Sequence, residues 1–152
     1  MSLSTFSSDF IDTTLYQLGA SSIKVVNGKQ HVVDFFLDDD LKVTYIFTIT
    51  RENRFYLQRA HPYPMVHGRF SNEHEIIDFI AKDCAAFRNA MNSKNYHTFV
   101  DSARNALSLA EDLEQLFLKR NVSKEDLAAL HDDCSRLRAS IKEIYEKSPA
   151  ID

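Results

Sequence analysis

The segment from residue 51 to residue 70 holds the densest group of side chains that could bind a charged partner. Four arginines share it with a single acid, Glu52, and aromatic residues are interleaved with them: Arg51, Arg54, Arg59 and Arg69, with Phe55, Tyr56, Tyr63 and Phe70. Guanidinium groups bind carboxylates and phosphates, and aromatic rings stack on planar groups. The segment could therefore bind an anionic ligand, an acidic stretch of a partner protein or, with less support, single-stranded nucleic acid. A solvated strand face is the simpler alternative.

Two histidines in the same segment suggest a second kind of site. If residues 61–70 form a loop beside a sheet, His61, Tyr63 and His67 could converge on a small-ligand pocket. A zinc site is not indicated, because no His-x-x-x-His pair occurs on a predicted helix. The aspartates at 38–40 lack the spaced ligands of a calcium loop and are typical of a polar turn. We expect no metal and no cofactor.

Motifs that assemble a catalytic site are missing from the sequence. No Gly-x-Ser-x-Gly or phosphate-binding loop occurs. The chain has three glycines, which leaves few places where the backbone could approach a phosphate closely. The sequence therefore names no catalytic residue and favours a non-catalytic protein.

Charge and composition narrow the classes of partner. The chain has 152 residues and a formal net charge of −4. Residues 1–71 carry seven acids and seven bases, whereas residues 72–152 carry fifteen acids and eleven bases. This acidic surplus makes nucleic acid an unexpected partner. No apolar run approaches the roughly 18 residues of a membrane span, and no signal peptide is recognisable, so we expect no membrane contact and a cytoplasmic location.

The order of the predicted elements gives an α+β fold in one domain, 1–152. A helix over Ser8–Leu18, capped by Ser7 or Ser8, ends at Gly19. Strand patterns within 20–60 are separated by three-residue breaks, which predicts a four-stranded antiparallel meander: Ser22–Val26, Gln30–Leu37, Leu41–Thr50 and Arg54–Ala60. Residues 61–70 form a loop, because Pro62 and Pro64 cannot donate to a ladder. Three helices then fill 72–147.

Alternation along the strands predicts two different sheet faces. Three-residue turns place Phe35 opposite Val43, Val33 opposite Tyr45, Leu37 opposite Leu41, Ile23 opposite Val33, Phe47 opposite Leu57 and Ile49 opposite Phe55. This odd-numbered face, with Val25, forms the predicted core. The even-numbered face is partly apolar, through Val32, Phe36, Ile46 and Tyr56. Such a patch is either covered by the first helix or used to bind something.

The last two predicted helices, 96–119 and 123–147, should form an antiparallel hairpin. Apolar residues in the final helix follow spacings of three and four: Leu127, Leu130, Cys134, Leu137, Ile141 and Ile144. That pattern is a heptad seam over almost three repeats. It could pack within the chain, or it could join two copies in a homodimer.

The first sixty residues resemble the opening of type III secretion effector chaperones. The resemblance rests on a helix that ends at Gly19 followed by a hairpin-rich sheet. Those chaperones are small, acidic and dimeric, which implies a protein-binding sheet. The chain departs from their pattern after residue 72, where three consecutive helices replace a return to strands.

The sequence thus favours a non-catalytic protein-binding or adaptor module. We expect its partner to be a protein, with an acidic segment, that binds the partly apolar sheet face and the arginines beside it: Val32, Phe36, Ile46, Arg54, Tyr56, Arg59 and Arg69. The alternative is a small-ligand-binding protein or enzyme with a pocket formed by His61, Tyr63 and His67.

Overall fold

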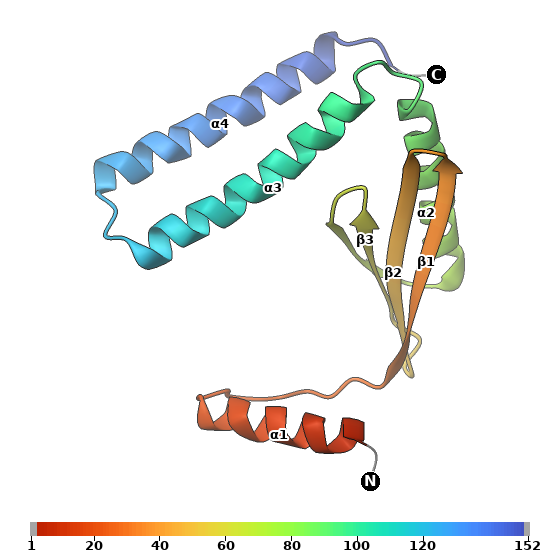
Figure 1. Ribbon diagram of the computed structural model, residues 1–152, viewed down its shortest axis with the longest axis vertical. Helices are drawn as coiled ribbons and strands as arrows, with labels where there is room; N and C mark the ends of the chain where they lie inside the picture. The colour runs from red at the N-terminus through yellow and green to blue at the C-terminus, as the bar shows by residue number, and fades with distance from the viewer. Residues whose placement is uncertain (1–2, 151–152) are drawn as a thin grey trace.

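The computed structural model describes residues 3–150 and confirms the α+β class (Figure 1). The described residues form four helices and four strands in the order α1 (Leu3–Gln17), β1 (Gly28–Asp38), β2 (Leu41–Thr50), β3 (Phe55–His61), β4 (Met65–Phe70), α2 (Glu73–Ala90), α3 (Tyr96–Lys119) and α4 (Lys124–Lys147). In Figure 1, α2 lies behind the strands, and the α3–α4 hairpin projects to one side. No helix in the described part of the chain is long and apolar enough to cross a membrane.

Helix α1 starts earlier than predicted and ends where predicted. Its first residue is Leu3, so the expected cap at Ser7 or Ser8 is wrong. A serine can cap a helix only if it stands at the start of that helix. Ser7 and Ser8 both lie inside α1. At the other end, Gly19 has φ +101°, and the Ala20 N–H donates to the Leu15 carbonyl at 3.0 Å. This geometry is a Schellman cap, which favours glycine.

The sheet is an antiparallel meander of strands β1-β2-β3-β4, but two of its strands differ from the prediction. Residues 22–26 are not a strand: the chain joins the sheet at Gly28, and β1 pairs with β2 alone among the described strands. An added Cβ at Gly28 would lie 2.7 Å from the Ile49 carbonyl oxygen, so glycine permits the close pairing there. Residues 65–70, predicted as a loop, form β4. Pro62 and Pro64 lie in the turn before it and remove no ladder hydrogen bond from β4.

Most of the predicted register is confirmed. Four pairs occur as expected: Phe35 with Val43, Val33 with Tyr45, Phe47 with Leu57, and Ile49 with Phe55. The predicted pair of Leu37 with Leu41 is wrong, because the register shifts after Phe36 and Asp38 takes the place opposite Leu41. The pairing of Ile23 with Val33 is also wrong, since Ile23 lies outside the sheet. Asn53 has φ +53° in the β2–β3 turn, as the predicted three-residue turn requires.

The core lies between the odd-numbered sheet face and α2. Asn72 caps α2 by accepting a hydrogen bond from the Glu75 N–H at 3.0 Å, which directs the helix across the sheet. The buried apolar residues include Leu41, Val43, Tyr45, Phe55, Leu57, Ile76, Cys84 and Phe87. Val25, predicted to join them, is 69% exposed because it precedes β1.

Helices α3 and α4 run antiparallel, as predicted, and are joined by a short turn (Figure 1). Ser123 caps α4, and its Oγ accepts a hydrogen bond from the Asp126 N–H at 3.0 Å. At the other end of the hairpin, the Arg104 guanidinium donates to the Pro62 carbonyl at 3.0 Å and ties α3 to the β3–β4 turn. No described residue of α4 is buried.

Candidate functional site

The sheet face turned away from α2, called the outer face below, is uncovered. Val32 is 65% exposed, Phe36 75% and Val66 63%. Helix α2 packs on the opposite face, against β1, β3 and β4, and α1 does not pack closely on the sheet. The structure therefore answers one question that the sequence left open: among the described residues, the first helix does not cover this apolar patch.

The strand register arranges the outer face in rows. Val32, Ile46, Gln58 and Val66 lie side by side across the four strands. Gln30, Thr48, Tyr56 and Arg69 form the neighbouring row. Because residues opposite one another in an antiparallel sheet project from the same face, a row that is apolar except for Gln58 lies directly beside one that ends in a tyrosine and an arginine.

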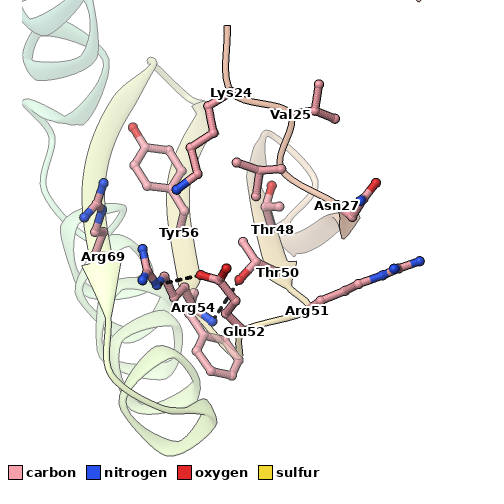
Figure 2. Close-up of a pocket in the computed structure, with 12 residues that line it drawn as sticks. Lys24, Val25, Asn27, Thr48, Thr50, Arg51, Glu52, Arg54, Tyr56 and Arg69 are labelled. Atoms are coloured by element: carbon pink, nitrogen blue, oxygen red, sulfur yellow. Dashed lines mark hydrogen bonds and ion pairs between the residues drawn. The ribbon is translucent and has the colours of Figure 1, made fainter. Parts of the chain in front are cut away.

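A pocket of about 490 Å³ lies at the end of the outer face near the β2–β3 turn (Figure 2). The segment before β1 forms one wall, and the Lys24 side chain extends from it toward Tyr56 (Figure 2). The residues that line the pocket are Lys24, Val25, Val26, Asn27, Thr48, Thr50, Arg51, Glu52, Arg54, Phe55, Tyr56 and Arg69. The outer face is thus both an exposed surface and, at this end, a concave site.

The pocket has a surplus of positive charge. Four cations line it, and one acid, Glu52, forms an ion pair with Arg54 at 3.2 Å (Figure 2). Lys24, Arg51 and Arg69 form no ion pair with any described residue. Arg51 points away from the other two cations in Figure 2, so an anionic group is favoured on the side of the pocket that holds Lys24 and Arg69.

The opposite end of the outer face has its charges paired. Lys42 contacts Asp34 at 3.1 Å, and the Thr44 hydroxyl donates to the same carboxylate at 2.6 Å. The hydrogen bond from Thr44, followed by that from Lys42, lowers the pKa of Asp34. The Lys42 ammonium lies 5.7 Å from the ring centre of Phe36. The unpaired positive charge is therefore confined to the Tyr56 end.

Arg59, predicted to lie with the other partner-binding residues, is on the opposite face. Its side chain is 3% exposed, and its Nη1 donates to the Asp83 carboxylate at 2.8 Å. The Tyr45 hydroxyl donates to the same oxygen at 2.7 Å. The guanidinium also lies 4.7 Å from the ring centres of Tyr63 and Phe87. Placing Arg59 on the binding surface is thus wrong, and its odd number, shared with Phe55 and Leu57, was the signal against it.

The buried network keeps the Tyr45 hydroxyl protonated. Burial, followed by the hydrogen bond to Asp83, raises the pKa of Tyr45 far above its usual value. Burial also raises the pKa of the Cys84 thiol, which lies 3.6 Å from the Tyr45 hydroxyl oxygen. These groups hold α2 on the sheet through a neutral phenol and a charged pair.

Tyr63 and His67, two residues of the alternative site, do lie together. They line an open cavity of about 420 Å³ with aromatic side chains from α2 and α3 and with Arg59 and Asp83. Arg59 Nε and His67 Nε2 are buried and have no hydrogen-bond partner among the described residues. Burial, and then the nearby Arg59 charge, lowers the pKa of His67.

His61 does not join this pair. It lines a different cavity, between the β3–β4 turn and α3, with Tyr96, His97 and Arg104. The three predicted residues of the alternative site therefore do not converge, because β4 carries His67 back across the sheet while His61 stays at the end of β3. The described residues contain no group of three His, Cys, Asp or Glu side chains that could hold a metal ion.

The structure adds residues that the sequence pattern did not indicate. Val66 joins the apolar row because residues 65–70 form a strand, and Lys24 and Val25 line the pocket because residues 20–27 cross the sheet end. Residues 65–70 follow two prolines and show little of the alternation typical of a strand. The sequence therefore did not place Val66 on the sheet. Nothing in the sequence marked Asp83 as the partner of Arg59.

Comparison with protein-family models, with curated proteins and with solved structures found no match to this chain.

Proposed function

We propose that the protein is a non-catalytic protein-binding module whose outer face binds an acidic, partly apolar segment of a partner. The observation that carries the proposal is the row in which Val32 and Val66 are exposed and Ile46 is half-buried, beside a pocket with a surplus of cations. Contiguous apolar surface rimmed by polar residues is typical of interaction sites.

The two parts of the surface have separate roles in this proposal. Apolar contact with Val32, Phe36 and Val66 supplies affinity, with about 1 kcal/mol for each half-exposed side chain that becomes buried. Arg54 and Arg69 select an acidic partner and speed its approach. Tyr56 lies between the two parts, and tyrosine and arginine are over-represented among the residues that dominate binding energy.

A peptide selection tests this function directly. Random peptides displayed on phage would be selected on the wild-type protein and counter-selected on the Arg54→Ala/Tyr56→Ala double variant. We expect the enriched peptides to combine apolar residues with Asp or Glu, and to bind the variant at least tenfold more weakly. Arg88→Ala, which removes an exposed arginine of α2 on the opposite side of the sheet, serves as the matched control.

Two results would contradict the proposal. One is equal affinity of the enriched peptides for wild type and the double variant, with circular dichroism showing that both are folded. The other is enrichment of basic rather than acidic peptides. Loss of affinity in the Arg88→Ala control would show that the effect is not specific to the outer face.

A second candidate function rests on the cavity around His67. Its aromatic walls and its two unpartnered nitrogens, Arg59 Nε and His67 Nε2, suit a flat ligand with a carboxylate or carbonyl. Titration with 2-naphthoate, followed by NMR, would test this candidate. We expect shifts at His67 and Phe79 that a Phe99→Ala variant weakens, and the absence of any shift at these residues would dismiss it.

The expectations of a cytoplasmic location and of no nucleic-acid partner stay predictions. Cell fractionation checks the first, and a mobility-shift assay with single-stranded oligonucleotides checks the second.

A further inference from the structure

The α3–α4 hairpin leaves its own apolar seam open. On α4, Leu127 is 43% exposed, Leu137 51%, Ile141 59% and Ile144 53%. The two helices enclose an apolar cavity of about 360 Å³ near their connecting turn, lined mainly by leucines, Phe117 and Cys134. The pairing of α3 with α4 therefore covers the seam partly at the turn end and leaves it bare toward the chain's C-terminal end.

Charge, like the exposure of the seam, changes along the hairpin from its connecting turn to its open end. The first ten residues of α4, 124–133, carry one lysine and four acids, and the remainder, 134–147, carries four bases and two acids. The half of α3 beside the turn, 108–119, adds three acids and one lysine. The hairpin is thus acidic at its turn end and basic at its open end.

The seam of α4 is also symmetric about the middle of the helix. Reversing the helix end for end exchanges Leu127 with Ile144, Leu130 with Ile141, and Cys134 with Leu137. Two copies of α4 packed antiparallel would therefore match apolar residues along the whole seam. The same arrangement places the acidic half of each helix beside the basic half of the other, whereas parallel packing would place like charges together.

We propose that a second copy of this chain covers the hairpin, with α4 antiparallel to its counterpart about a two-fold axis near Cys134. Bare apolar residues at the open end of each copy, among them Ile141 and Ile144, then pack against the turn end of the other. A 24-residue helix is about 36 Å long, so two helices side by side present a face on the order of 700 Å². A stable interface needs about 800 Å² per partner, which four packed helices approach.

This dimer is independent of the outer-face function, because the hairpin projects to one side of the sheet (Figure 1). Light scattering coupled to gel filtration should give twice the mass of one chain for the wild type. Ile141→Glu should return the mass to that of one chain. Val32→Glu, an equally polar change at an exposed outer-face position, should keep the dimer while weakening the selected peptides.

The two variants separate the two proposals. Ile141→Glu should bind the peptides as the wild type does, since the outer face is untouched. A wild type with the mass of one chain overturns the dimer, and so does a dimer that survives Ile141→Glu unchanged. A dimer lost in Val32→Glu instead would assign the contact between copies to the sheet, which also overturns the proposal.

Disulfide cross-linking tests the antiparallel orientation. In a Cys134→Ser background, Leu127→Cys and Ile144→Cys are made in separate chains, mixed and oxidised. Residues 127 and 144 lie about 26 Å apart on one helix, far beyond the roughly 7 Å span of a disulfide, so only contact between copies can bring them together. We expect cross-linked pairs of one chain of each kind. Pairs of identical chains would indicate a parallel dimer and overturn the orientation, and no cross-link in either case would overturn the α4 contact.

Discussion

The same four strands form the outer face and the inner face, which is the face covered by α2. The two faces differ in how far their apolar side chains are buried and their charges are paired. On the inner face, Val43 and Leu57 are fully buried under α2, and Arg59 has a carboxylate partner and two aromatic neighbours. On the outer face, Val32 and Val66 are exposed, and three of the four cations at one end form no ion pair with a described residue. The core forms between the inner face and α2 and does not include the apolar row of the outer face. That row is therefore free to contact other molecules.

Three arginines, Arg54 just before β3, Arg59 in β3 and Arg69 in β4, show the same contrast within one residue type. Arg54 and Arg69 are exposed near the Tyr56 pocket, whereas Arg59 is buried and spans the sheet–helix boundary. The sheet face from which each side chain projects, set by the register of its own strand, decides which role it takes. A cluster of arginines in a sequence is therefore one surface only where the residues share a face.

The largest effect should follow from breaking the inner charged pair. Asp83→Ala leaves the Arg59 guanidinium buried without its counter-charge, and we expect a loss of about 3–5 kcal/mol in unfolding free energy. Denaturant unfolding measures it. Arg69→Ala on the outer face is the control, with a change within about 0.5 kcal/mol. Equal effects of the two variants would remove the distinction between structural and surface arginines.

A pair of valines gives the next largest contrast. Val43 is fully buried and Val32 is 65% exposed, and both lie in neighbouring strands. We expect Val43→Ala to lower the unfolding free energy by about 2 kcal/mol, because it leaves a cavity. Val32→Ala should change it by less than about 0.5 kcal/mol. Similar losses in the two variants would mean that something covers the outer face in solution.

The smallest effect concerns pH and is confined to the inner face. The folded protein binds a proton at His67 more weakly than the unfolded chain does, since burial lowers the pKa below its usual value of about 6.5. The unfolded state therefore holds more protons in acid, and unfolding free energy falls as the pH drops below about 6.5. His67→Gln should flatten that fall between about pH 7.5 and about pH 5.5. An unchanged slope in the variant would contradict the burial of this imidazole.

Sequence reasoning recovered the fold because its signals are local and repeated. Alternation in residues 41–50 set the face and register of β2, and the glycine at 19 and the serine at 123 marked helix ends that the structure confirms. Sequence reasoning failed where strand formation depends on pairing with a neighbouring strand rather than on the residues of the segment alone. Residues 22–26 read as a strand in isolation but do not pair with the free edge of β1, whereas residues 65–70 pair with β3 despite weak alternation.

The placement of the candidate residues on the sheet was predicted in part for the same reason. Parity placed Val32, Phe36, Ile46 and Tyr56 on one face, and the register confirms that arrangement. What sequence could not give was contact between distant elements: the Asp83 partner of Arg59, the segment before β1 that closes the pocket, and the separation of His61 from His67. Each depends on how helix α2 or a connecting segment crosses the sheet.

The central claim is that the inner face holds the fold together and the outer face binds. Methyl NMR of the protein titrated with an enriched acidic peptide tests it in one measurement. The account predicts shifts for the methyl groups of Val32, Ile46 and Val66, with those of Val43 and Leu57 nearly unchanged. Shifts centred on the inner methyl groups, or on the residues around His67, would contradict it.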